Sequence, residues 1–422
     1  MDQGNTAFLL ICAALVLLMT PGLAFFYGGL VKAKSVISMM MMSFGALGLI
    51  GVLWVLYGYA ITFSNGGVGN FVGIDGILGI DMGEIGLAGV YAEASDPQGG
   101  FPLIAFAAFQ ATFAILTVAL ISGAIADRAK FGAWMVFAGV WATVVYFPVA
   151  SWVFNFTLGD DGTVVDGGWI AYSVGAIDFA GGTAVHINAG AAALALALVL
   201  GKRVGFAKGA HVPHNPPFVL LGAGLLWFGW FGFNAGSELA ADGLASIAFL
   251  NTIAAPAAAI LGWLVVEKVR DGKPTSVGAA SGAVAGLVAI TPACASLTPG
   301  WAILLGLIAG VVCALAIDLK FKLGFDDSLD VVGIHLVGGL IGTLYIGFFA
   351  TDVGLFTGGD ASQLGKQAIA AFSVLIYSFV LSYAIGWVIQ RTMGFRVKNE
   401  DEIAGIDTVV HGEEGYVLTG AR

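Results

Sequence analysis

The sequence reads Asp178-Phe-Ala-Gly-Gly-Thr-Ala-Val-His186 in one place and Asp330-Val-Val-Gly-Ile-His335-Leu-Val-Gly-Gly339 in another. Each histidine lies in an uncharged stretch that opens with an aspartate and is long enough to span a bilayer. Ionisable side chains inside hydrocarbon are costly and usually face a pathway or a partner, so two histidines in matching places predict a functional site. The pair predicts a pore that handles protons. For a lone histidine, a hydrogen bond between helices would be an equally good interpretation.

Composition supports a membrane protein built from helices. Of the 422 residues, 59% are hydrophobic and only 10% are charged, too few polar side chains to cover a water-soluble globule of this length. Many of the 63 glycines stand in small-x-x-small arrays such as Gly338, Gly339 and Gly342, which let helices pack closely in lipid. Membrane-spanning β-strands alternate apolar and polar residues, and these continuous apolar runs do not.

The uncharged runs predict eleven transmembrane helices, because a hydrocarbon core about 30 Å thick needs roughly 20 apolar residues per helix. The predicted spans are residues 7–31, 35–63, 101–126, 131–156, 179–201, 217–237, 243–266, 277–295, 300–317, 331–351 and 367–390. Pro292 and Pro299 divide the long uncharged run between residues 274 and 317 into two spans. The glycine-rich, acidic segment 64–100 is predicted to be an external loop.

The basic residues predict the orientation. With the N-terminus outside and the C-terminus inside, sixteen of the seventeen lysines and arginines fall in inner loops and the tail, and only Lys366 lies outside. This distribution follows the positive-inside rule, and a missed or added span would disturb it. The sequence therefore predicts an all-α polytopic protein of the cell membrane, either a plasma membrane or a bacterial inner membrane.

The matching histidine stretches, in spans five and ten, predict an internal repeat. Since each unit has an odd number of spans, the second unit must enter the membrane from the opposite face, which gives two inverted five-helix repeats. We place the repeats at residues 7–201 and 217–351 and the final helix at 367–390. Together they form a membrane domain of residues 1–394, followed by an inner tail of residues 395–422.

The two aspartates that open the histidine stretches are predicted to lie at opposite ends of the protein. Each of Asp178 and Asp330 would stand near a helix N-terminus, where a carboxylate can accept hydrogen bonds from unpaired backbone N–H groups. Helix capping is the better-founded role for each, ahead of direct contact with a substrate.

Motifs of other functional classes are missing from the sequence. Cys12, Cys294 and Cys313 are odd in number and lie in apolar spans, which favours packing over disulfides or metal binding. His211 and His214 stand beside prolines without a third ligand, which is typical of loop surface. With no glycine-rich phosphate loop or nucleophile elbow, the sequence predicts neither an enzyme nor a cofactor, a metal or a nucleic-acid partner.

Five motifs resemble those of the ammonium transporter (Amt/Mep/Rh) family. They are Leu18-Met-Thr-Pro-Gly-Leu-Ala-Phe-Phe-Tyr-Gly-Gly29, the segment from Asp178 to Arg203, Trp230-Phe-Gly-Phe-Asn-Ala-Gly-Ser237, Gly286-Leu-Val-Ala-Ile-Thr-Pro-Ala-Cys-Ala295 and the segment from Asp330 to Gly339. The resemblance covers essentially the whole chain. It implies a homotrimer in a lipid bilayer, with one pore per protomer between the inverted halves, and a tail that can couple to cytoplasmic PII signalling proteins.

The resemblance also implies roles for single residues. At an outer ammonium site it implies a set of aromatic, hydroxyl and carboxylate groups: Phe113, Phe154, Ser237 and Asp178. Along the pore it implies a second closing ring, twin imidazoles, apolar lining and a nearby tyrosine: Phe233, His186, His335, Trp230, Val331 and Tyr146.

The sequence departs from the family at the outer site, where a tryptophan is usual and this chain has Phe154. Phenylalanine is a weaker cation-π partner than tryptophan, so we expect a different affinity or rate at this site. Trp152, two residues away, would replace the usual tryptophan if the local register shifts.

The implied function is ammonium transport for nitrogen uptake. Ammonium would be recruited at the outer aromatic site, lose a proton and cross the histidine-lined pore as ammonia. Potassium has no proton to give, and moving an intact charge through a dry pore costs several kcal/mol. Histidine titrates at about pH 6.5, which suits it to receiving or relaying the proton. Two alternatives stay open: an ammonium sensor with little transport, and a neutral ammonia gas channel.

Overall fold

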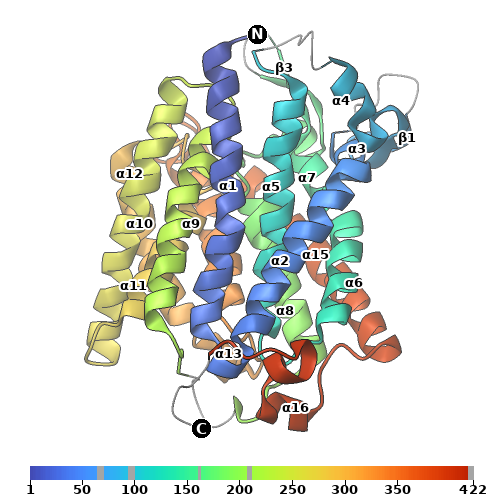
Figure 1. The fold of residues 1–422 in the computed structure, drawn as a ribbon. Helices are drawn as coiled ribbons and strands as arrows, with labels where there is room; N and C mark the ends of the chain where they lie inside the picture. The colour runs from blue at the N-terminus through green and yellow to red at the C-terminus, as the bar shows by residue number, and fades with distance from the viewer. Residues whose placement is uncertain (64–70, 94–99, 160–162, 207–211, 417–422) are drawn as a thin grey trace.

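Helices make up most of the chain in a computed structural model, which describes residues 1–63, 71–93, 100–159, 163–206 and 212–416. The long helices stand side by side in one bundle (Figure 1). We call one end of the bundle the hairpin end, because the strands β1 (Phe71–Ile74) and β3 (Phe156–Leu158) lie there. The opposite end, with α13 (Leu319–Leu323) and α16 (Asn399–Ala404), is the tail end.

The first half of the bundle consists of composite rods, in which short 3-10 or π-helical segments continue an α-helix without a break. In chain order the elements are α1 (Gln3–Leu30); η1 (Ala33–Ser35), α2 (Val36–Leu53), η2 (Trp54–Gly58) and α3 (Tyr59–Thr62); α5 (Leu103–Ile121) and η4 (Ser122–Ile125); α6 (Phe131–Trp141), η5 (Ala142–Tyr146) and α7 (Phe147–Phe154); η6 (Ile170–Val174); η7 (Gly182–Ile187) and α8 (Asn188–Leu200).

The second half begins after the loop that follows α8. Its elements are α9 (Pro216–Gly236), α10 (Gly243–Arg270), α11 (Ser276–Ile290), α12 (Pro299–Ala316) with α13, η9 (Val332–Leu336) with α14 (Val337–Phe349), α15 (Ser362–Thr392), α16 and η10 (Asp407–His411). Several of these helices start at a capping side chain, as the sequence favours. Asn215 accepts from the N–H of Phe218, and Asp242 accepts from the N–H groups of Leu244 and Ala245.

Ten helical rods of the described chain are long and apolar enough to cross a membrane, and α11 is an additional, shorter apolar helix. Each predicted span coincides with one of these elements, usually within a few residues of its ends. The exception is the predicted span 277–295, because α11 ends at Ile290 and a series of turns follows through Thr291 and Pro292. The prediction of eleven full-length spans is therefore matched by ten long helices and one short one.

Apolar side chains occupy both the interior and the outer surface of the bundle. Inside, α1 packs along α9, α10 packs on α11 and α12, and α8 packs on α15. On the outer surface, Leu261 is 64% exposed and Ile376 is 60% exposed, and many other large apolar side chains are exposed as well. A water-soluble protein rarely presents such a continuous apolar surface, whereas a lipid-facing bundle does.

Segment 64–100, predicted to be a plain loop, contains regular structure. Strand β1 pairs with β2 (Leu78–Asp81) in antiparallel register, and η3 (Met82–Leu87) and α4 (Ala88–Glu93) follow; residues 64–70 and 94–99 lie outside the described residues. A second hairpin pairs β3 with β4 (Val164–Gly167). The all-α prediction missed both hairpins, which lie at the hairpin end.

Candidate functional site

Two short π-helical turns carry the histidines found in the sequence. Turn η7 holds His186 and continues into α8, and turn η9 holds His335 and continues into α14. The chain reaches η7 from β4 at the hairpin end and reaches η9 from α13 at the tail end. The two segments therefore enter the bundle from opposite ends. Single π-helical turns of this kind are frequent at functional sites.

Asp178 fixes the start of η7. Its Oδ1 accepts from the N–H groups of Gly181, at 2.9 Å, and Gly182, and its Oδ2 accepts from the N–H, at 2.8 Å, and the hydroxyl of Thr183. The tight turn requires a glycine at position 181, where φ is +113°. The capping role that the sequence favoured for Asp178 is therefore present, and most of the carboxylate's acceptor capacity is taken up by the backbone.

At the start of η9 the corresponding residue is Asp327 and not Asp330. Oδ2 of Asp327 accepts the N–H of Val332, the first residue of η9, at 2.7 Å. Asp330 instead forms an ion pair with Lys320. Asp178 precedes His186 by eight positions, and Asp327 precedes His335 by eight positions. The prediction that Asp330 caps the second helix was wrong, because it chose the aspartate nearest to the uncharged stretch.

The two histidines meet in the interior of the bundle. Their Nδ1 atoms lie 3.2 Å apart, and their rings are nearly parallel with centroids 5.3 Å apart. His186 is 0% exposed and His335 is 3% exposed. Nε2 of His186 is buried and has no hydrogen-bond partner among the described residues. A buried, unpaired nitrogen is costly, so this atom is a candidate for contact with a ligand.

Close backbone contact sets the distance between the histidine segments. A side-chain carbon added at Gly190 of α8 would lie 2.5 Å from the backbone nitrogen of Leu336 in η9, so only glycine fits there. Trp230 of α9 stacks on the ring of His186 at 5.4 Å, and its Nε1 donates to the hydroxyl of Thr291 at 2.8 Å. The predicted pore residues His186, His335 and Trp230 are thus brought together.

A column of aromatic rings continues from the histidines toward the hairpin end. Phe233 lies 6.1 Å from the ring of His186, and Phe113 stacks on Phe233 with ring centroids 4.1 Å apart. Phe113 is 1% exposed and Phe233 is 0% exposed. Two stacked, buried rings leave no open passage between them, so a solute can pass only if a ring moves.

Phe154, and not Trp152, lies beside this column. The ring of Phe154 meets Phe113 edge-on at 6.3 Å. Trp152 packs against Trp169 and Tyr377, and its Nε1 donates to the carbonyl of Ile77. The register shift that would bring Trp152 to the column is therefore absent.

The remaining predicted site residues occupy different places. Ser237 is partly buried, and its hydroxyl donates to the carbonyl of Phe233 at 2.8 Å, which ties it to the column. Val331 is buried on the tail side of His335, and both Val331 and Tyr27 pack closely against Gly123. Tyr146 is fully buried and packs against Trp141 and Phe147, neither of which belongs to the column.

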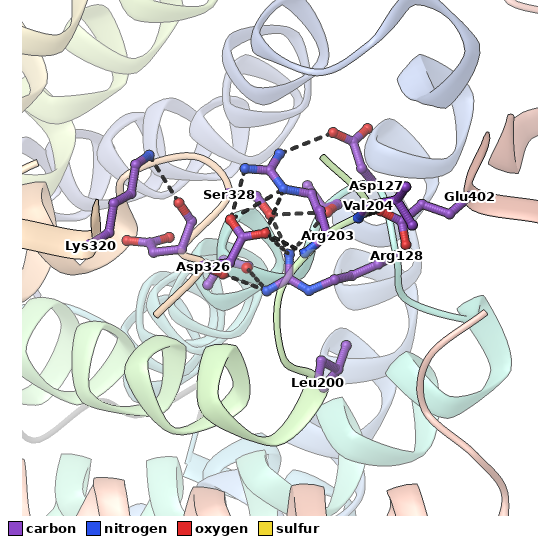
Figure 2. A network of polar contacts seen from close by, with 12 residues as sticks. Asp127, Arg128, Leu200, Arg203, Val204, Lys320, Asp326, Ser328 and Glu402 are labelled. Carbon is purple, nitrogen blue, oxygen red and sulfur yellow. Dashed lines mark hydrogen bonds and ion pairs between the residues drawn. The ribbon is translucent and has the colours of Figure 1, made fainter. Parts of the chain in front are cut away.

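A network of charged groups at the tail end was not predicted from the sequence (Figure 2). Arg203 forms a bidentate ion pair with Asp326, in which Nε and Nη2 each lie 2.9 Å from a carboxylate oxygen. Its Nη1 lies 3.2 Å from Oδ2 of Asp127. Burial acts to raise the pKa of Asp326, but the hydrogen bonds and charges of Arg203 and Arg128 hold it below its usual value. Asp326 is therefore ionised at neutral pH.

Arg128 forms the centre of the same network. Its side chain is fully buried and donates to the carbonyls of Ala124 and Asp326 and to the hydroxyl of Ser328. Burial lowers the pKa of this guanidinium to about 10, so it remains protonated at neutral pH. Arg128 thereby joins the segment after η4 to the segment that leads into η9.

Glu402 of α16 attaches the tail to this network. Its Oε1 accepts the N–H of Val204 at 2.7 Å, and its Oε2 lies 2.8 Å from Nη2 of Arg396. Nη1 of Arg396 donates to the carbonyl of Leu200, the last residue of α8, at 3.1 Å. The sequence showed these residues only as loop charges, and the available signal was their position directly beside span ends.

No group of three or more histidine, cysteine, aspartate or glutamate side chains arranged to hold a metal ion was found in the described part of the chain. His211 lies outside the described residues. His214 bonds to the carbonyl of Val31 through Nδ1 and to the hydroxyl of Tyr416 through Nε2, so both of its nitrogens are in use. Cys12, Cys294 and Cys313 are free and buried.

The whole chain resembles proteins that move ammonium. Residues 7–416 match the model of the Ammonium Transporter Family. An ammonium transporter of Mycobacterium tuberculosis is 56% identical, over 98% of this chain and 90% of its own length.

Solved structures share the fold. A protein described as a sensor Amt protein superposes with a TM-score of 0.87 at 27% identity, covering 97% of this chain and 98% of that one. Mep2 of Candida albicans superposes with a TM-score of 0.82 at 32% identity, covering 95% of this chain and 88% of that one. The matching family is thus one of transporters. With its apolar helices, the chain is a multi-pass cell membrane protein, and it belongs to the ammonium transporter family.

Proposed function

We propose that this protein transports ammonium by binding the cation at an aromatic mouth, removing a proton and passing ammonia along the paired histidines. The observation that carries the proposal is the contact between His186 and His335, 3.2 Å apart and buried behind the stacked rings of Phe113 and Phe233. Imidazoles can donate or accept at either nitrogen, which no apolar pore lining can do.

Recruitment would occur where the column meets the hairpin end. The rings of Phe113 and Phe154 offer π-faces to a cation, an attraction of about 0.5–2 kcal/mol, and Ser237 offers a hydroxyl oxygen as acceptor. Because the oxygens of Asp178 already accept several hydrogen bonds, its contribution is the attraction of its negative charge rather than direct contact. These groups bind ammonium without selecting it from potassium.

Selection would occur at the stacked rings and the histidines. An ion that keeps its charge must lose its water in a passage that offers few polar groups, which costs several kcal/mol. Ammonium avoids the cost by leaving its proton, because ammonia is neutral and small. Trp230 and Val331 would supply apolar lining on either side of the imidazole pair, and Tyr146 would support the wall from behind.

The geometry of the pair gives the ammonia a defined set of partners. Contact between two Nδ1 atoms requires one to donate and the other to accept, so one ring carries its hydrogen on Nδ1 and the other on Nε2. One Nε2 then accepts and the other donates. Ammonia can both donate and accept a hydrogen bond, so it can bind to each Nε2 of the pair in turn. Potassium can form neither hydrogen bond.

The proposal includes the arrangement in the membrane. The hairpin end would lie outside and the tail end inside, with the membrane domain over residues 1–394, inverted repeats at 7–201 and 217–351, and the tail at 395–422. The tail-end basic residues that bind Asp326 and Glu402 support this orientation, because inner loops are rich in lysine and arginine. The protein would act as a homotrimer, and its tail would be a contact for a PII signalling protein.

A second candidate function is ammonium sensing with little transport. It is favoured by the similarity to a protein described as a sensor, and by Phe154 at the mouth. Binding at the mouth would then change the position of the tail through α8, Arg396 and Glu402.

Current recording from purified protein in planar lipid bilayers or supported proteoliposomes tests the proposal. An ammonium jump should give a saturable current, a methylammonium jump a smaller one, and a potassium jump none. Potassium current of similar size would refute selection by proton loss. Ammonia flux without current would favour a neutral gas channel, and tight binding without flux would favour the sensor.

A further inference from the structure

A buried carboxylate lies at the tail end of the histidine segment and has no part in the proposed steps. Asp327 is 2% exposed, and its Oδ1 has no hydrogen-bond partner among the described residues. Its Oδ2 accepts from Val332, three positions before His335. At about 1.5 Å per residue, the carboxylate is roughly one helical turn from the histidine along this segment.

A cavity of about 310 Å³ is lined in part by the three residues that follow Asp327 in the chain. Lys320, Ser328, Leu329 and Asp330 are among the residues that line it. Asp327 directly precedes this lining segment but is itself buried behind it. Along the chain, the carboxylate thus stands between the lining of a space that can hold water and the segment that carries His335, which suits a relay group.

The charges around Asp327 determine how readily it takes a proton. On its own segment it faces Asp330, from α13 it faces Lys320, and Arg128 and Tyr27 lie within range of its charge. Lys320 is held by Asp330 and by the backbone carbonyl of Asp327, so within the described chain the carboxylate of Asp327 forms no ion pair of its own. Burial, followed by the charge of Asp330, raises the pKa of Asp327.

Asp178 shows what the same position looks like when both carboxylate oxygens cap the helix start. Both of its oxygens accept hydrogen bonds, from Gly181, Gly182 and Thr183. Asp327 has the same spacing to its histidine but leaves one oxygen unpaired. Capping does not account for a buried, unpaired oxygen. Such an oxygen is free to take up a proton.

We propose that the carboxylate of Asp327 binds the transported proton at the tail end of the pore, between His335 and the cavity. This inference rests on the proposed function, in which a proton leaves ammonium and travels apart from ammonia. An N–H bond of a protonated imidazole, or an O–H bond of an intervening hydronium ion, breaks as an O–H bond forms on Oδ1. The carboxylate becomes a neutral acid, and it later returns the proton to a water molecule in the cavity.

Infrared difference spectroscopy tests proton binding without requiring transport. Purified protein in lipid is titrated with acid, and the C=O stretch of protonated carboxyl groups is followed. Wild-type protein should show a band that Asp327→Asn lacks and that Asp271→Asn keeps, because Asp271 is an exposed tail-end aspartate paired with Arg270. Asp330→Asn should move the midpoint of this band to lower pH, since it removes a like charge and frees Lys320.

Ammonium-driven current tests the role in transport. Asp327→Asn retains an oxygen that can accept from Val332, so the helix start is kept while the proton site is lost. Its current should fall about a hundredfold or more, the usual contribution of a proton-transfer group, and Asp271→Asn should match the wild type.

The two measurements separate the two proposals. An unchanged band in Asp327→Asn, an unmoved midpoint in Asp330→Asn, or wild-type current in Asp327→Asn would each overturn the role of Asp327. If wild-type protein itself carries no ammonium current, the proposed function fails, and the infrared titration still decides whether Asp327 takes up a proton.

Discussion

The Nδ1 atoms of His186 and His335 lie 3.2 Å apart, so the two rings cannot both carry a hydrogen on the facing nitrogen. Each ring therefore fixes the tautomer of the other. The pair behaves as one unit, with one Nε2 that donates and one that accepts, and removal of either ring affects both.

His335→Ala should lower ammonium-driven current about a hundredfold or more, the range expected for loss of a proton-transfer group. The variant removes one imidazole and leaves Nδ1 of His186 without its partner. The measurement is current from proteoliposomes after an ammonium jump. His411→Ala is the matched control, because that imidazole packs on Phe131 in the tail region. A His335→Ala current within about twofold of the wild type, a change under about 1 kcal/mol, would contradict the role of the pair.

Phe154→Trp should lower the ammonium concentration that gives half-maximal current. The ring of Phe154 lies against Phe113 at 6.3 Å, and tryptophan attracts a cation more strongly than phenylalanine does. A gain of about 0.5–1 kcal/mol corresponds to a few-fold change in that concentration. Phe156→Trp, on the exposed strand β3, serves as the control. An unchanged half-maximal concentration would remove Phe154 from the binding site.

Asp178→Ala should abolish flux and also lower the unfolding temperature. The change leaves the N–H groups of Gly181, Gly182 and Thr183 without their acceptor, and each unpaired group costs about 1–3 kcal/mol. Asp178→Asn keeps an acceptor oxygen but loses the charge, so it should fold better than Asp178→Ala and still transport poorly. Tryptophan fluorescence during heating and methylammonium uptake measure the two effects. A wild-type rate in Asp178→Ala would show that this carboxylate is not needed.

Arg128→Lys should destabilise the protein by about 3–5 kcal/mol, as expected when a buried charged group loses its partners. A lysine cannot reproduce the forked contacts to Ala124, Asp326 and Ser328 from this fully buried position. The unfolding temperature in detergent is the measurement. The side chain of Arg270 is 34% exposed and pairs with Asp271 and Asp318, so Arg270→Lys should change the unfolding temperature little. Equal effects of the two substitutions would contradict a structural role for burial of Arg128.

The stability that Asp326 provides should be lost in acid. Its pKa in the folded protein lies below that of the unfolded chain, which is about 3.9, because Arg203 and Arg128 favour the ionised form despite burial. A carboxyl with a lowered folded pKa contributes stability above the unfolded pKa, and this contribution disappears as the pH falls through the folded value. The difference in unfolding temperature between wild type and Asp326→Asn should therefore be full at pH 6 and shrink below about pH 4. A difference that stays constant with pH would show that ionisation of Asp326 does not matter.

The long apolar helices could be predicted from the sequence because a bilayer imposes a minimum length and excludes charge. The end of α11 could not, since the five residues by which the predicted span extends beyond it, 291–295, are equally uncharged whether they form helix or turn. The contact of His186 with His335 was only a hypothesis, because counting residues along two segments does not give the distance between them. That distance depends on the backbone contact at Gly190.

The tail-end network escaped prediction for a different reason. Asp127, Arg203 and Asp326 belong to separate loops, and loop charges are usually solvated. Their burial results from the folding of the helices beneath them. Asp327 was overlooked because Asp330 is closer to the uncharged stretch, although the matching spacing of eight residues was visible in the sequence.

The edge-on contact of Phe154 with Phe113 has a practical consequence for engineering an ammonium indicator. Phe154 ends α7, and its ring contacts Phe113, the outer of the two stacked rings, whereas the imidazoles lie behind the inner ring, Phe233. In the proposed mechanism, dose response and ion discrimination would thus depend on different side chains. The range of ammonium concentrations detected could be adjusted at position 154, with the stacked rings and the histidine pair left unchanged.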